Sequence, residues 1–168
     1  DMGEPVWEGG RVLGKKDMRA MYRWYLALGN CWTDCYGICG KLLNCRWPGR
    51  SKKVLERMTA VAPDWYDGSI HFSWAAYYTV LPGILGGDMK LAGEYFDRAL
   101  GLGPHMTNFY VSRALYYHVK QKDKNGFIAD LHHAIAIDPR RADSLEYAWA
   151  AWYKKRAVQL LKDTDKYF

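Results

Sequence analysis

Apolar residues recur along this chain at the spacing of amphipathic helices rather than at the two-residue spacing of strands. Proline and glycine divide the chain into segments of helical length, with breaks at residues 47–49, 81–83, 86–88 and 138–139. Strict apolar–polar alternation is scarce between these breaks. The pattern therefore predicts an all-α protein, which its 168 residues would form as a single domain.

The breaks place the expected helices to within a few residues. One begins near Asp17 and runs to the cysteine segment, and residues 1–16 before it are expected to be irregular. Ser51 is expected to cap the second helix. The remaining helices are expected over residues 51–61, 64–80, 88–102, 107–119, 125–137 and 143–161.

Three segments of the chain resemble one another and end on Pro63, Pro104 and Pro139, which are 41 and then 35 residues apart. Small residues such as Ala99 and Ala134 share one column of this alignment. A period near 34 residues that closes on A-x-x-x-P is typical of tetratricopeptide repeats. We therefore expect a tetratricopeptide-like solenoid of about three helix pairs with a C-terminal capping helix, because stacking buries faces that one pair cannot bury alone.

The longer first interval results from residues 81–88, an apolar and glycine-rich segment between the helices of the middle pair. Leu81, Ile84 and Leu85 make it more apolar than a solvated loop, which favours a contact with a ligand or partner. A tolerated loop insertion is the alternative.

Composition narrows the function classes. The chain is 49% hydrophobic and 25% charged, which excludes an intrinsically disordered chain. No apolar run approaches the roughly 20 residues of a membrane span. The net charge is +6, but the basic residues are dispersed and no nucleic-acid motif accompanies them, so we expect no nucleic acid partner. Aromatic residues make up 15% of the chain and indicate either a large core or a concave binding surface.

Four cysteines lie within 15 residues of one another: Cys31, Cys35, Cys39 and Cys45. In an exported protein they would form two disulfides, although cysteines four apart in a helix have poor disulfide geometry, so the helix would have to break near Gly37 or Gly40. A stripe of thiolates for a soft metal and free buried thiols are the alternatives. The spacing lacks the C-x2-C pair that is typical of zinc sites.

Catalytic patterns are scarce. No serine lies in a nucleophile elbow, and neither the histidines nor the aspartates have the spacing of a metal site or an acid–base pair. We therefore expect no enzyme, no cofactor and no resident metal.

Residues 81–88 (L-P-G-I-L-G-G-D), followed by L-A-G-E-Y-F-D-R-A-L at 91–100, resemble the T-component of TRAP transporters. The segment A-P-D-W-Y-D-G at 62–68 and the ending at 156–168 are similar to that family as well. The resemblance covers residues 17–168.

This resemblance implies an all-helical periplasmic protein with repeats of the tetratricopeptide kind and no known catalytic centre. Family members bind the solute-binding protein of a TRAP transporter, which captures small carboxylate-bearing or hydrophobic solutes, and some form trimers. Many carry a lipid anchor. The chain does not begin with Met and has no lipobox cysteine near its start, so we expect any anchor to lie outside this segment.

The sequence thus predicts a non-catalytic accessory protein of solute uptake with an aromatic cleft. Arg23 or Arg113 would neutralise a ligand carboxylate. The alternatives are a scaffold that binds a peptide of a partner protein and a cysteine-based metal-binding module. The predicted ligand- or partner-binding residues are Tyr25, Trp74, Tyr77, Tyr78, Leu81, Pro82, Gly83, Gly86, Gly87, Asp88, Tyr110 and Tyr117.

Overall fold

The structure is a computed structural model that describes residues 13–35, 37, 40, 44, 46–141 and 147–168. These residues are all-helical, as the hydrophobic pattern predicts, and they contain no strand. Within the same residues, every helix is either too short or too polar to cross a membrane. The predicted irregular segment 1–16 lies mostly outside the described residues.

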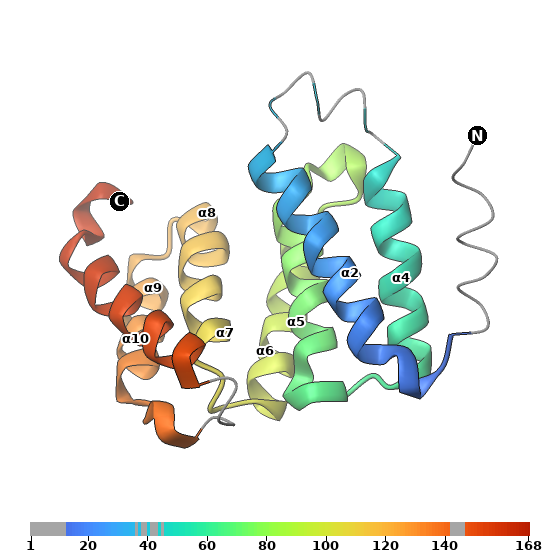
Figure 1. Cartoon of the computed structure of the whole chain (residues 1–168). Coiled ribbons are helices and arrows are strands. Elements are labelled where there is room, and N and C mark those ends of the chain that lie inside the picture. The colour runs from blue at the N-terminus through green and yellow to red at the C-terminus, as the bar shows by residue number, and fades with distance from the viewer. Residues whose placement is uncertain (1–12, 36, 38–39, 41–43, 45, 142–146) are drawn as a thin grey trace.

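The helices form two groups, which we call the first and second regions (Figure 1). The elements of the first region are η2 (Lys15–Asp17), α2 (Met18–Asn30), η3 (Cys31–Cys35), α4 (Trp47–Val61), α5 (Trp65–Val80), η4 (Gly83–Leu85) and α6 (Met89–Leu102). The elements of the second region are α7 (Thr107–Ser112), η5 (Arg113–His118), α8 (Val119–Gln121), α9 (Lys124–Ala136), η6 (Pro139–Arg141), α10 (Tyr147–Lys162) and η7 (Thr164–Lys166).

Most helix boundaries agree with the prediction because capping residues mark them. Asp88 begins α6, and its Oδ1 accepts hydrogen bonds from the backbone N–H groups of Lys90 and Leu91 at 2.9 and 3.0 Å. Asp123 begins α9 in the same way, with a hydrogen bond from the backbone N–H of Gly126 at 2.9 Å. The expected helix at 107–119 is a continuous run through α7, η5 and α8, of which η5 is a π-helix.

The predicted cap at Ser51 is wrong. Helix α4 begins at Trp47, with Arg46 at the N-cap position and Pro48 in the first turn. Proline suits this position because the first helical N–H groups have no intrahelical partner. Ser51 lies one turn further on, where its hydroxyl donates to the carbonyl oxygen of Trp47 at 3.0 Å.

Helix α5 contains a kink near its start that the sequence pattern did not predict. Tyr66, Asp67 and Gly68 all have left-handed backbone conformations. At Gly68 (φ 84°) a side chain would lie 3.0 Å from the carbonyl oxygen of Ala99 and from the side chain of Leu102. Glycine therefore allows the kinked end of α5 to approach the end of α6 closely.

Each region has its own apolar core. The core of the first region lies among α2, α4 and α5, and its most deeply buried residues include Met18, Leu55, Met58 and Ile70. The core of the second region lies among α7, η5, α9 and α10, and its most deeply buried residues include Phe127, Leu131, Ala134 and Ala157.

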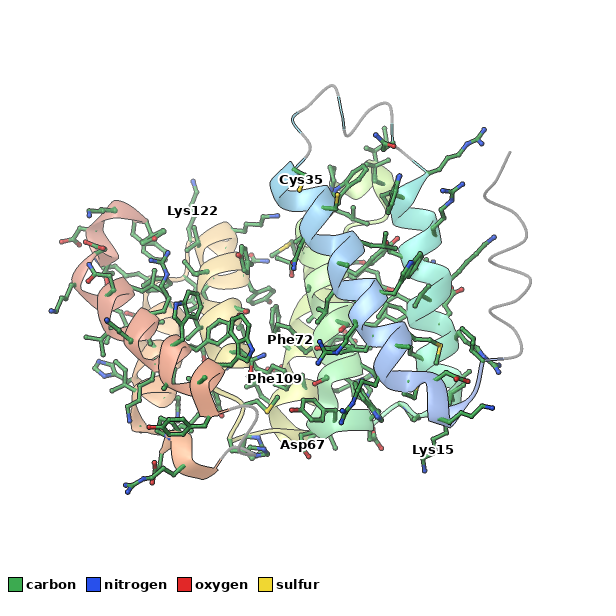
Figure 2. The ribbon with its side chains drawn as sticks, in the orientation of Figure 1. Lys15, Cys35, Asp67, Phe72, Phe109 and Lys122 are labelled. Carbon is green, nitrogen blue, oxygen red and sulfur yellow. The ribbon has the colours of Figure 1, made fainter. Side chains whose placement is uncertain are left out.

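The regions meet at a smaller cluster around Phe109. The rings of Phe72 on α5 and Phe109 on α7 stack with centroids 4.5 Å apart and planes 13° apart. Figure 2 shows these two labelled side chains facing each other between the two groups of helices. The Nζ of Lys120 also donates to the carbonyl oxygen of Thr79 across this junction.

Candidate functional site

An aromatic cluster lies between α5 and α6 and contains three of the predicted binding residues. Trp74, Tyr78 and Tyr95 have ring centroids 5.6 to 5.8 Å apart and planes within 24° of one another. Tyr77 packs edge-on against Trp74 and Tyr78. His71 extends the stack at 6.0 Å from Tyr95. Helical spacing explains this arrangement, because residues three, four and seven apart lie on one face of α5.

The inner members of the cluster belong to the protein core. Trp74 is 5% exposed, and its indole N–H donates to the hydroxyl of Thr59 at 2.8 Å. The hydroxyl of Tyr25, also a predicted binding residue, donates to the carbonyl oxygen of Ser73 at 2.9 Å. Burial raises the pKa of Tyr25 far above its ordinary value, and burial also raises the pKa of Tyr77. These side chains hold the helices together from inside.

The outer members of the cluster are Tyr78 and Tyr95, which are half-buried. The guanidinium of Arg98 lies 5.3 Å from the centroid of the Tyr95 ring, which is a cation–π distance. Burial raises the pKa of Tyr78 above its ordinary value. These two rings are therefore the part of the cluster that a partner can reach.

The segment 81–88, which we call the rim loop, follows the aromatic cluster directly. Its backbone is closed by hydrogen bonds from the N–H groups of Leu85 and Gly87 to the carbonyl oxygen of Pro82, at 2.9 and 3.0 Å. The N–H of Asp88 donates to the carbonyl oxygen of Tyr78 at 3.1 Å, which fixes the loop to α5. The rim loop is a rigid turn rather than an open insertion.

Two of the three glycines of the turn have a structural reason. Gly86 has φ 96°, a conformation that favours glycine. At Gly87 a Cβ would overlap the carbonyl oxygen of Leu81, so no side chain fits there. Gly83 has open space around it.

The apolar residues of the rim loop divide into inner and outer ones. Leu81 is buried, and Leu85 packs against the core of the first region. Ile84 is 94% exposed. The loop therefore presents one large apolar side chain to solvent on a backbone that other side chains anchor.

Two predicted binding residues lie away from the aromatic cluster, on the second region. Tyr117 packs edge-on against Phe96 at 5.9 Å, and Gly93 leaves the space that its ring occupies. Tyr110 stacks on His133 at 5.5 Å. Tyr110 also borders a cavity of about 420 Å³, whose other lining residues are Pro104, His105, His133, Ala136, Ile137 and Asp138.

The sequence pattern did not predict a charged network that lies mainly on the second region. The Arg113 guanidinium donates to both carboxylate oxygens of Asp130 at 2.7 Å and to Asp97 at 2.8 Å. His118 lies 3.2 Å from Asp130 and 2.8 Å from Asp123 through its two ring nitrogens. Arg113 is thus engaged by carboxylates of its own chain, which corrects the expectation that it would neutralise a ligand.

The environment of Asp130 decides its charge. Burial alone would raise the pKa of this carboxyl, but hydrogen bonds from Arg113 and His118 lower the pKa below its ordinary value. Asp130 lies on the buried face of α9, among Phe127, Leu131 and Ala134. A carboxylate in an apolar stripe requires a cationic partner, and Asp130 in this stripe is the signal in the sequence that could have indicated such a network.

The structure describes two of the four cysteines for which disulfides are predicted. Cys31 and Cys35 lie in η3, a π-helix that continues α2. Cys31 is half-buried and Cys35 is exposed, whereas Cys39 and Cys45 lie outside the described residues. The two disulfides therefore stay a prediction. In the part of the chain that the structure describes, no group of three or more His, Cys, Asp or Glu side chains is placed to hold a metal ion.

Comparison with known proteins identifies the family. The sequence model described as TRAP transporter T-component matches residues 13–168. A search of curated proteins finds no match. The T-components are accessory to a transporter and are not known as enzymes. Because the match spans essentially the whole chain, the chain belongs to the TRAP transporter T-component family.

Proposed function

We propose that this chain is a non-catalytic accessory protein of a TRAP solute uptake system, and that its rim loop binds the solute-binding protein. The family supports a role in TRAP transport. We propose in addition that the protein acts in the periplasm, where the rim loop would contact the solute-binding protein. A homotrimer and a lipid anchor outside this segment are further expectations from the family resemblance.

We further propose that the helices stack as tetratricopeptide-like pairs. The candidate pairs are α2 with α4, α5 with α6, and the run α7–α8 with α9, and α10 would cap them. Pro63, Pro104 and Pro139 each follow the second helix of a pair within a few residues. The buried residues Ala99 and Ala134, both 0% exposed, allow the close helix packing that such pairs need.

The observation that carries the proposed function is the exposure of Ile84. A solvated loop gains nothing from an isoleucine at its tip, yet this side chain is 94% exposed on a turn closed by backbone hydrogen bonds. A rigid loop loses little conformational entropy on binding, which favours affinity. An apolar side chain presented in this way suits a pocket on a folded partner.

A small organic solute is the second candidate, favoured by the cavity beside Tyr110. Its volume of about 420 Å³ lies within the range of small-molecule sites. Tyr110 and His133 supply an aromatic wall, and His105 supplies a polar group. This combination suits a small hydrophobic or carboxylate-bearing molecule.

The test is the affinity for the solute-binding protein of the same transport system, measured by isothermal titration calorimetry. Ile84→Asp is expected to weaken binding roughly tenfold or more, because a carboxylate cannot enter an apolar pocket. Its melting temperature should equal that of the unmodified chain, since Ile84 contacts so little of the protein.

Val158→Asp is the matched control, because Val158 on α10 is also an exposed apolar residue (39%) but lies in the second region. It should bind as the unmodified chain does. Equal affinities of all three proteins would reject the rim loop as the contact. Binding of an extended peptide without binding of the folded receptor would favour the peptide scaffold instead.

A further inference from the structure

The charges of this chain are unevenly distributed. Residues 13–61 contain ten lysines and arginines but only three aspartates and glutamates. Residues 62–168 contain thirteen lysines and arginines and twelve aspartates and glutamates. Net positive charge is therefore concentrated on the part of the chain that forms α2 and α4, while the rest is close to balanced.

Most of these basic side chains are exposed, on η2, on α2 and on or beside α4. Besides Lys15 and Lys16 on η2, five of them are exposed, and these five form what we call the basic face: Arg19, Arg23, Arg46, Lys52 and Lys53. Figure 2 shows long side chains with nitrogen at their tips extending from α4 away from the other helices. The basic face thus points outward, at the end of the molecule opposite α10 (Figure 1).

Within the described residues, one weak ion pair engages the basic face. The Lys52 ammonium and the Glu56 carboxylate are 4.0 Å apart, and both are about half exposed. In the second region, by contrast, Arg113, Lys124 and Lys166 each lie 2.8 Å or less from a carboxylate. The other four charges of the basic face have no ion pair among the described residues, although neutralising pairs are common on the same molecule.

Apolar side chains accompany the charges. Leu13, Trp24 and Leu26 are 36%, 39% and 37% exposed and lie on or beside α2. Aromatic rings such as tryptophan favour the boundary between water and lipid headgroups. Basic residues combined with exposed tryptophan and leucine are typical of surfaces that lie on anionic membranes.

We infer that the basic face rests on a bilayer surface that contains anionic phospholipids. Near such a surface each lysine or arginine contributes about 1 kcal/mol of attraction. The exposed tryptophan and leucines beside these charges favour lipid over an acidic protein, because such side chains suit the boundary between water and headgroups. A bilayer requires charge density rather than a pocket, and the cavity beside Tyr110 lies away from α2 and α4. The second region would then extend away from the membrane.

The test is co-sedimentation of the full chain with phosphatidylcholine vesicles that contain or lack phosphatidylglycerol. The chain is expected to bind the anionic vesicles at low salt and to dissociate from them at high salt. It should not bind vesicles of pure phosphatidylcholine. The triple variant Arg19→Gln, Arg23→Gln and Lys53→Gln should lose roughly tenfold or more in affinity. Circular dichroism would confirm that this variant is folded.

The matched control removes the same charge elsewhere, through Lys90→Gln, Lys155→Gln and Lys162→Gln on α6 and α10, all exposed. It should keep most of the binding. Equal loss in both triples, or no binding of the unmodified chain to anionic vesicles, would overturn the inference. Binding to poly-glutamate without binding to vesicles would assign the face to an acidic protein instead. No solute-binding protein is present, so the result is independent of the proposed function.

Discussion

The first and second regions of this protein use their polar groups in different ways. In the first region, stacked aromatic rings and a close backbone approach join the helices, as at Trp74 and at Gly68. In the second region, the Arg113–Asp130–His118 network joins η5 to α9 and reaches Asp97 on α6. The first region leaves its basic side chains outside, whereas the second region places charges inside.

This difference indicates where each region is available to a partner. Charges that are paired within the chain hold helices in register but offer little to a ligand. Unpaired surface charges and an exposed isoleucine stabilise nothing within the fold, so their value lies in contacts with other molecules. The surfaces that we propose for receptor and membrane both belong to the first region, whereas the paired charges of the second region hold its helices together.

The largest expected effect tests the charged network. Asp130→Asn keeps the shape of the side chain but places an amide against the guanidinium of Arg113, which is only 20% exposed. Removing one partner of a buried ion pair destabilises a protein by about 3–5 kcal/mol. Urea unfolding followed by circular dichroism should show this loss. Asp165→Asn, at an exposed pair with Lys124, is the control and should leave the midpoint unchanged.

The same variant gives the pH dependence. Because the pKa of Asp130 is lowered on folding, its carboxylate stabilises the protein above the ordinary pKa of 3.8, and this contribution is lost as the pH falls through the lower folded value. The gap in unfolding free energy between the unmodified chain and Asp130→Asn should therefore stay full near about pH 5 and shrink below 3.8. A gap that widens in acid would contradict this account.

The next effect tests the backbone of the first region. Gly87→Ala would force a Cβ into the carbonyl oxygen of Leu81, so the rim loop must shift. We expect a loss of about 2–3 kcal/mol in the free energy of unfolding, measured in urea. Gly83→Ala is the matched control, because its Cβ would meet open space. If the two alanine variants are equally stable, the rim loop is not the rigid turn described here.

Local rules were enough to predict the helices from the sequence. The apolar stripes, the capping Asp88 and the prolines act within a few residues, so α5, α6 and α9 lie close to their expected bounds. The kink at Tyr66 and Asp67 was not predictable in this way. It depends on contact between the start of α5 and the end of α6, which are distant in sequence.

The candidate site shows the same difference between local patterns and contacts that form only in the folded chain. Trp74, Tyr77 and Tyr78 were predicted because they share one face of a single helix. That Tyr95 completes their stack depends on how α6 packs against α5. Asp130 and Arg113 come from different helices and meet only in the folded chain, so the sequence alone could not pair them.

The smallest expected effect measures how firmly the two regions are joined. Phe72 and Phe109 are the stacked pair at the junction, with centroids 4.5 Å apart. A double-mutant cycle with Phe72→Ala and Phe109→Ala should give a coupling of about 0.5–1.5 kcal/mol. Each single variant already removes the contact between the two rings, so the double variant does not lose it a second time.

The cycle of Phe72→Ala with Phe127→Ala is its control. Phe127 lies in the core of the second region, where its ring contacts Tyr167 and Phe168. Residues without shared contacts give nearly additive effects, so this coupling should be close to zero. If both cycles are additive, the junction transmits nothing and the regions would unfold in separate transitions. A coupling confined to the cycle of Phe72 and Phe109 would mean that the first and second regions unfold as one cooperative unit.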